Sequence, residues 1–363
     1  MSSLSNFIGQ FGIELEIGVM SENDATRYVR SNMSGFNITH DASIQSDIRI
    51  TNNGMKLLQK PPEYLPTDQY TSGAEIVSDP MEFSDSSKEL IKKLTYMLEM
   101  KGEPEESYRE SLHVHIDCVY NLEILKNIIS LARYLEDMFY YIGGNGYTHR
   151  GMKVNEFLYC RPITNYGPTV VESNCGLVQV FTVKDLLEST SVNSFFNRLG
   201  GAGNMSISHM HPVRYFWCNP YSLLAHKTLE FRVFNKTLNP EFIWAEILLC
   251  RAFTRWAVRE ALNDNILDYL PVNSIFDGRS KSEILNTLYE FAENTKLKPE
   301  IVEILATIIK QTPRIIVPER YIKTHTRNSV SYNTSDYLPN KIPSSDIYSV
   351  EVDDIHARRG ERR

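Results

Sequence analysis

The sequence predicts an α+β fold in which a layer of helices covers the apolar face of a sheet. Three observations lead to this prediction. Strand and helix patterns do not alternate regularly along the chain, as they would in a doubly wound parallel sheet. Several strands have apolar side chains on one face and ionisable side chains on the other. Several longer segments have apolar residues at helical spacing, and these helices can bury the apolar faces of the strands.

Strands are predicted where apolar and polar residues alternate. Four segments have this pattern: 11–19, 74–77, 112–119 and 228–235. Between the first two, residues 21–70 are predicted to be irregular, because Asn52-Asn53-Gly54 and Pro61-Pro62 indicate turns.

Helices are predicted where apolar residues recur every three or four positions. The segments are 84–100, 122–142, 184–197, 240–262, 279–293 and 298–311. Pro240 suits the first turn of its helix, and the glycines from Gly143 onward are expected to end the second one.

We expect residues 1–318 to form one domain, which is helical from about residue 240. The chain has 363 residues, 42% hydrophobic and 23% charged, so its composition is that of a globular protein with a substantial core. Residues 319–363 are polar and end in a run rich in arginine, so we predict a weakly ordered tail.

Composition excludes several classes of partner. The net charge of −7 provides no broad basic surface for nucleic acid. No stretch approaches the ~20 apolar residues of a membrane span, and residues 1–10 lack the pattern of a signal peptide. The five cysteines are scattered without a CxxC pair, which indicates reduced thiols. We therefore expect a soluble, cytoplasmic protein that binds neither nucleic acid nor a membrane.

Three of the predicted strands carry ionisable side chains two residues apart, which places them on one face. These side chains are Glu14 and Glu16, His113 and His115, and Glu230 and Arg232. Solvent-facing strand positions are usually filled with Lys, Thr, Ser and Gln instead. Carboxylates with histidine are ligands for Mg²⁺ or Mn²⁺, and an arginine nearby suits a phosphate. The three strands together therefore predict a metal and phosphate site.

Each pair by itself more often has a structural role, as a solvated face or a cross-strand ion pair. Zinc is the competing metal, because His113, His115 and a carboxylate could form a three-ligand catalytic zinc site. The excess of carboxylates over softer ligands favours a hard cation.

These strands resemble those of the amidoligase family, distant relatives of glutamine synthetase and glutamate–cysteine ligase. The resemblance covers roughly residues 9–260, and its motifs occur in a specific order and spacing. They are Gly12–Glu16, His40–Ser43, Gly73–Pro80, Leu112–His115, Arg214–Asn219 and Thr228–Asn239. The resemblance implies a curved antiparallel sheet of the glutamine-synthetase kind, with helices on its convex face. The concave face would hold ATP and two or three divalent cations, Mg²⁺ or Mn²⁺.

The resemblance also implies metal ligands, carried over residue by residue. Glu14, Glu16 and Glu75 correspond to metal-binding carboxylates. His113 and Glu230 correspond to the pair that holds the metal bridging the ATP phosphates.

Four residues correspond to groups that act on the nucleotide or the substrates. His115 would approach a nucleotide phosphate, and Arg232 would bind the nucleotide and stabilise the transferring γ-phosphoryl group. Arg214 corresponds to a second phosphate or carboxylate clamp, and Asp41 would face the amine.

The implied activity is that of an ATP-dependent carboxylate–amine ligase, with small-molecule or peptide substrates and an acyl-phosphate intermediate. Two alternatives stay open: a zinc-dependent hydrolase that uses the two histidines, and a catalytically silent binding protein on the same scaffold. Trp217, Cys218 and Lys236 depart from the family pattern, which affects the expected substrate more than metal or nucleotide binding.

Overall fold

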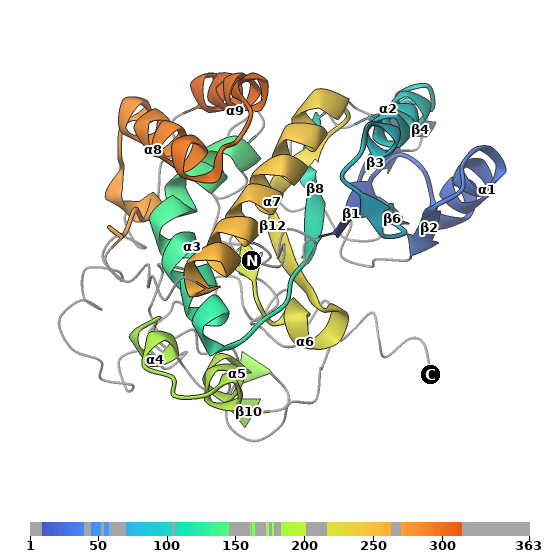
Figure 1. Cartoon of the computed structure of the whole chain (residues 1–363). Coiled ribbons are helices and arrows are strands. Elements are labelled where there is room, and N and C mark those ends of the chain that lie inside the picture. Colours follow the sequence, from blue (N-terminus) through green and yellow to red (C-terminus); the bar gives the residue numbers. More distant parts are fainter. Residues whose placement is uncertain are drawn as a thin grey trace.

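An antiparallel sheet lies at the centre of the part of the chain that the structure describes (Figure 1). This computed structural model describes residues 9–39, 45–51, 54–57, 70–103, 106–144, 160, 162–163, 172–173, 176–177, 183–200, 216–262 and 270–313. The strands of the main sheet follow the order β11-β12-β8-β1-β6-β2, and β7 pairs with β1. The predicted α+β class is therefore confirmed, and the sheet is antiparallel.

The main sheet contains the four predicted strands and three further ones. Its members are β1 (Gln10–Ile17), β2 (Phe36–Thr39), β6 (Ala74–Ser78), β7 (Met81–Glu82), β8 (Glu106–Asp117), β11 (Cys218–Asn219) and β12 (Thr228–Thr237). Two small sheets are separate from it. They consist of β3 (Gln45–Thr51), β4 (Gly54–Leu57) and β5 (Tyr70–Ser72), and of β9 (Glu172–Ser173) and β10 (Gly176–Leu177).

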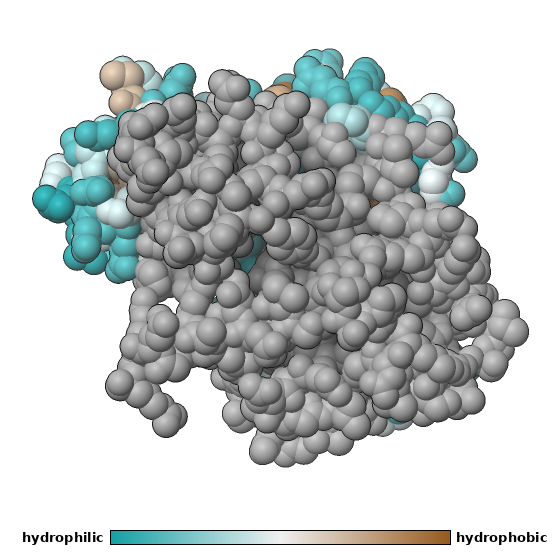
Figure 2. All heavy atoms as spheres, turned by 180° about the vertical axis from the view of Figure 1, so that it is seen from behind, coloured by the Kyte–Doolittle hydropathy of each residue, from teal (hydrophilic) through white to brown (hydrophobic). Residues whose placement is uncertain are grey.

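Nine α-helices occur within the described residues. They are α1 (Glu22–Asn32), α2 (Asp85–Glu99), α3 (Leu122–Gly143), α4 (Val183–Leu187), α5 (Val192–Gly200), α6 (Ser222–His226), α7 (Pro240–Leu262), α8 (Lys281–Thr295) and α9 (Pro299–Gln311). None of these helices combines the length and hydrophobicity needed to span a bilayer. The described surface that is visible from behind is mainly hydrophilic (Figure 2).

Strand alternation gives the main sheet one apolar face, which packs on helices. The apolar side chains at alternate positions of β1 and β8 are fully buried: Phe11, Ile13, Leu15, Leu112, Val114 and Ile116. The ring of Phe11 lies 5.9 Å from that of Trp244 in α7. Phe139 of α3 stacks on Phe231 of β12, with the ring centroids 5.8 Å apart. Helices α3 and α7 therefore cover this face (Figure 1). The ionisable side chains alternate with the apolar ones along these strands, so they lie on the other face.

The end of α3 packs directly on the backbone of β12. A Cβ atom added to Gly143 would lie 2.3 Å from the carbonyl oxygen of Val233, which is far closer than real Cβ contacts. The glycine thus permits an approach that no other residue allows. This packing holds β12, which carries Glu230 and Arg232, against the extensively buried helix α3.

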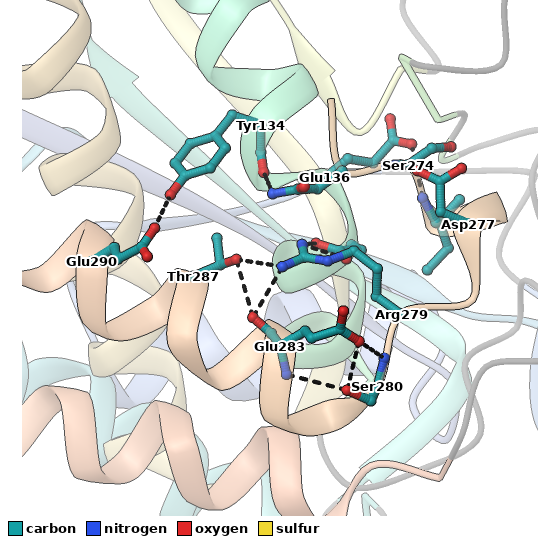
Figure 3. Close-up of polar contacts among 12 residues, drawn as sticks. Tyr134, Glu136, Ser274, Asp277, Arg279, Ser280, Glu283, Thr287 and Glu290 are labelled. Carbon is teal, nitrogen blue, oxygen red and sulfur yellow. Dashed lines mark hydrogen bonds and ion pairs between the residues drawn. The ribbon is translucent and has the colours of Figure 1, made fainter. Parts of the chain in front are cut away.

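A polar cluster attaches α8 to α3 (Figure 3). Arg279, just before α8, donates from Nη1 to a carboxylate oxygen of Asp137 at 3.0 Å and from Nη2 to Thr287 Oγ1 at 2.9 Å. Tyr134 of α3 donates to Glu290 of α8 at 2.7 Å. These contacts are polar links between the two helices.

The predicted helices are confirmed, except that 184–197 is wrong as a single helix. The structure has two helices here, α4 and α5, with residues 188–191 between them. Ser191 Oγ accepts the backbone N–H of Ser194 at 3.0 Å and so caps the start of α5. Serine competes for backbone hydrogen bonds in this way, and the helical pattern did not reveal the break.

The prediction that residues 21–70 are irregular is also wrong. Helix α1 and strands β2, β3, β4 and the first residue of β5 lie in this segment. Ser21 caps the start of helix α1, because its hydroxyl accepts the backbone N–H of Asp24 at 3.3 Å. Its buried face consists only of Ala25 and Val29, so its apolar pattern is weak. The tail predicted at 319–363 lies outside the described residues, and the single domain at 1–318 stays a prediction.

Candidate functional site

Strand register brings the two acidic residues of β1 beside a histidine of β8 and a glutamate of β6. Strand β1 lies between β6 and β8 in the main sheet. Glu14 is the register partner of His113 in β8, and Glu16 is the partner of Glu75 in β6. Both Glu14 and Glu16 lie on the face that the helices leave uncovered, so the three strands form one polar surface.

Strand β12 extends this surface on the far side of β8. Glu230 is the register partner of His115. Arg232 lies on the same face as Glu230, and its guanidinium contacts the Glu230 carboxylate. The backbone N–H of Arg232 donates to the carbonyl oxygen of Trp217 at 2.8 Å, which attaches this part of β12 to the chain just before β11.

Glu14 lies between the two histidines and is shared by two groups of ligand atoms. Its Oε2 is 3.0 Å from His113 Nδ1, and its Oε1 is 3.2 Å from His115 Nε2. In one group, ligand atoms of Glu14, His115 and Glu230 lie within 4.8 Å of one another. Glu14, Glu75 and His113 form the other group under the same limit. Each group has the donor types and the spacing to hold a cation.

The electrostatics of Glu14 and His115 are coupled. Burial raises the pKa of Glu14, but the charge of His115 and hydrogen bonds from both histidines bring this pKa well below its ordinary value. Burial likewise lowers the pKa of His115, and the Glu14 carboxylate more than reverses this and raises it to about 9. In the protein alone, a protonated His115 therefore balances the charge of Glu14 at neutral pH.

Glu230 and Arg232 form a second buried ion pair. Burial raises the pKa of Glu230, whereas Arg232 and His115 lower it below its ordinary value. Burial lowers the pKa of Arg232, but Glu230 and Glu14 raise it. Asn219 donates from Nδ2 to the second oxygen of Glu230 at 2.7 Å. The carboxylate is thus ionised and held in orientation from two sides.

Glu16 and Glu75 are each held by a neighbouring strand. Glu16 accepts the backbone N–H of Ser111 at 2.7 Å, and Glu75 accepts the hydroxyl of Thr39 at 3.0 Å. Glu75 belongs to the second group of ligand atoms, whereas Glu16, its register partner, belongs to neither group. Its role as a metal ligand stays a prediction.

The grouping of the histidines differs from the one that the resemblance implies. His113 and Glu230 were expected to share a metal, but each of them joins Glu14 in a different group. His115 was expected to contact a phosphate, whereas in the structure it is His115, and not His113, that lies beside Glu230. The expected roles of these residues stay predictions. Asp41 and Arg214 lie outside the described residues.

Several polar residues that support the site were missed from the sequence. The hydroxyls of Ser111 and Thr228 lie 2.9 Å from His113 Nε2 and 3.1 Å from His115 Nδ1. Each precedes a predicted ligand on its own strand by two residues, so strand alternation places it on the site face. This two-residue spacing could have predicted the positions of Ser111 and Thr228 at the site. No such local spacing indicates Asn219, because it lies on β11, a strand that carries none of the predicted ligands.

Lys236, which departs from the family pattern in the last motif, forms a buried ion-pair cluster. Its side chain is fully buried, and its ammonium lies 2.7 Å from Glu103 and 3.5 Å from Glu110. Glu103 also accepts the backbone N–H groups of Val19 and Met20 at 2.8 and 3.0 Å. The cluster therefore links the end of β12 to the loop that follows β1.

A family model matches most of the region that builds this site. Residues 8–254 match the family described as "Putative amidoligase enzyme", which is more than half of the chain. The matched segment includes all of the candidate site residues discussed above. A comparison with curated proteins finds no match.

Proposed function

The chain belongs to the amidoligase family, and on that premise we propose that it is an ATP-dependent carboxylate–amine ligase. A carboxylate does not react with an amine at neutral pH, because its oxygen is a poor leaving group. In the proposed reaction a carboxylate oxygen attacks the γ-phosphorus of ATP, and ADP leaves. The amine then attacks the carbonyl carbon of the acyl phosphate, loses a proton and displaces phosphate, which leaves an amide.

The observation that carries the proposal is the position of Glu14 between two groups of ligand atoms. The donors of the two groups are three carboxylates and two imidazoles. Carboxylate-rich sets fit Mg²⁺ or Mn²⁺, whereas zinc sites take more nitrogen and sulfur. Glu14, His115 and Glu230 would hold one cation, and Glu14, Glu75 and His113 the other. Bound cations would offset the repulsion between a triphosphate and a substrate carboxylate.

Arg232 is the group proposed to contact the transferring phosphoryl group. Its guanidinium is buried beside Glu230 and stays charged because the carboxylates around it raise its pKa. A guanidinium has five N–H donors in a planar fork, so it can contact Glu230 and a phosphate oxygen at once. An arginine in this role contributes around 10³-fold or more to the rate of phosphoryl transfer.

The proposal also includes the glutamine-synthetase-like form of the sheet, the class of substrates and the cytoplasmic location. An antiparallel sheet with helices on one face and carboxylates on the other supports the glutamine-synthetase-like arrangement. The substrates would be a small-molecule or peptide carboxylate and an amine in the cytoplasm. We assign acceptance of the amine proton to Asp41 and the second clamp to Arg214, both on the family resemblance.

Ligand-dependent thermal unfolding of the full chain tests the nucleotide and metal site. Mg²⁺ with ATP at about 100 times the dissociation constant stabilises the native state by ~2.7 kcal/mol. We expect this shift in the wild type and its loss in Glu14→Gln. Glu89→Gln on the exposed face of α2 serves as the control and should respond like the wild type. ADP release is then screened with pairs of carboxylates and amines.

Two outcomes would overturn the proposal in favour of an alternative. Stoichiometric zinc that survives purification, with no response to Mg²⁺ and ATP, would indicate the zinc-dependent hydrolase. The same melting temperature with and without ligands, in both the wild type and Glu14→Gln, would indicate a silent binding protein.

A further inference from the structure

Two hydroxyl groups lie behind the histidines of the site, each on the ring nitrogen that faces away from Glu14. Thr228 Oγ1 is 3.1 Å from His115 Nδ1, and Ser111 Oγ is 2.9 Å from His113 Nε2. The nitrogens that face Glu14 are Nε2 of His115 and Nδ1 of His113. The two rings therefore present opposite nitrogens to the same carboxylate.

We propose that Thr228 is a positioning residue that holds His115 with Nε2 toward a bound cation. Ser111 has the matching role for His113, with Nδ1 toward the cation. The inference rests on the proposed function, since it requires a divalent cation beside Glu14. It goes beyond the proposed function because it gives a role to Thr228 and Ser111, which the family resemblance does not include as ligands.

The chemistry of imidazole explains why a hydroxyl is needed there. A carboxylate only accepts hydrogen bonds, so His113 Nδ1, which is hydrogen-bonded to Glu14, carries a proton in the protein alone. His115 Nε2 faces Glu14 at 3.2 Å as a buried nitrogen without a hydrogen bond. A nitrogen that binds a cation carries no proton, so the N–H of the neutral ring would then lie on the other nitrogen. That N–H needs an acceptor, which fixes the tautomer and the orientation of the ring. A serine or threonine hydroxyl can accept it.

The hydroxyl of Thr228 has a second partner besides His115. Its hydroxyl lies 3.2 Å from that of Ser222, which is buried at the start of α6. If Thr228 donates to Ser222, its lone pairs face the ring of His115. The turn between them depends on Lys227, which has a left-handed φ of 58° and donates its N–H to Leu223 at 3.2 Å. Local backbone geometry thus joins the two hydroxyls.

The first test is Mn²⁺ affinity measured by calorimetry on the full chain. Loss of an outer-shell hydrogen bond to a metal-binding histidine typically weakens binding 10–100-fold. Thr228→Val keeps the shape and removes the acceptor, so we expect at least a ~10-fold weaker affinity, within that range. Thr228→Ser keeps the hydroxyl and should restore most of the wild-type affinity. Thermal melts confirm that each variant is folded.

Ser111→Ala is the matched variant for the other histidine. It removes only the hydroxyl and keeps the backbone N–H that Glu16 accepts at 2.7 Å. We expect it to weaken the binding event that depends on Glu75, whereas Thr228→Val weakens the one that depends on Glu230. Equal effects of both variants on a single binding event would contradict the assignment of one hydroxyl to each ring.

Ring ¹⁵N spectra give a readout that a structural role would not change. The protein is labelled at histidine nitrogen and loaded with Zn²⁺ as a diamagnetic probe. We expect His115 to be protonated at Nδ1 and His113 at Nε2, and Thr228→Val to alter only the His115 signals. The same tautomer in both rings would overturn the inference.

The outcomes separate this inference from the proposed function. If the wild type binds Mn²⁺ through Glu14 and Thr228→Val binds it equally tightly, the inference fails and the proposed function stands. If Thr228 governs the affinity but no carboxylate–amine pair releases ADP, the inference stands and the ligase proposal fails. Absence of Mn²⁺ binding in the wild type would overturn both.

Discussion

The ammonium of Lys236 lies 2.7 Å from a carboxylate oxygen of Glu103, and both side chains are completely buried. A second carboxylate, that of Glu110, lies 3.5 Å from the same ammonium. Buried charges of this kind depend on one another, because removal of one partner leaves an uncompensated charge in a medium of low dielectric constant.

Lys236→Met should therefore destabilise the protein strongly. We expect a loss of about 3–5 kcal/mol in the free energy of unfolding, measured by urea titration. Lys88→Met is the control, because Lys88 forms an ion pair of the same length with Glu241 at a partly exposed position. That variant should lose less than ~1 kcal/mol. Similar losses in the two variants would show that burial of the cluster does not matter.

Gly143→Ala should also lower the stability, although alanine normally favours a helix over glycine by ~1 kcal/mol. The new methyl group would lie 2.3 Å from the carbonyl oxygen of Val233, so α3 or β12 must move. Overpacking of this kind typically costs about 1–3 kcal/mol, which should appear as a lower melting temperature. Gly12→Ala is the control, because its methyl would meet ordinary contacts of 3.6 Å and beyond.

The buried carboxylate of Asp137 should make stability depend on pH. Burial raises its pKa to about 7, although Arg279 acts in the opposite direction. Its ordinary value is about 4, so between about pH 4 and 7 the native state binds more protons than the unfolded state. Stability from this group therefore falls as the pH rises through that window, by at most ~1.4 kcal/mol per pH unit.

Asp137→Asn removes this contribution, so the variant should show a flatter profile of unfolding free energy between pH 4 and 7. Chemical denaturation at a series of pH values measures it. Parallel profiles of the variant and the wild type would mean that Asp137 titrates alike in the folded and unfolded states.

The sharing of Glu14 predicts how many cations each carboxylate variant retains. Glu14→Gln should lose both Mn²⁺ binding events, because Glu14 belongs to both groups of ligand atoms. Glu230→Gln and Glu75→Gln should each lose one, because each residue belongs to a single group. Calorimetric stoichiometry distinguishes these cases. Retention of one full binding event in Glu14→Gln would show that the two groups do not share this ligand.

Much of the site was predictable because strand alternation is a local property. Glu14, His113 and Glu230 each stand in a short strand pattern with its apolar residues on the opposite face, which sufficed to predict one polar surface. Glu75 was added by the family resemblance, because it is the only ionisable side chain of its predicted strand and so has no partner two residues away on the same face.

The rest depends on which strands are neighbours, and local patterns do not contain this information. That Glu14 faces both histidines follows from β1 lying beside β8 with a particular register. That Glu230 joins His115 instead of His113 follows from the register of β12. The burial of Lys236 was equally hidden, because its two carboxylate partners are more than 100 residues away in the chain.

The contacts of Glu103 also determine how the strand that bears Glu14 exchanges its amide hydrogens. Strand β1 is paired on both sides, and the next backbone N–H groups, those of Gly18, Val19 and Met20, are bonded to the Glu103 carboxylate. Fraying from this end would have to break contacts to a fully buried carboxylate that is itself bonded to Lys236. Deuterium should therefore enter β1 and its following loop only through the large-scale openings that expose the whole sheet.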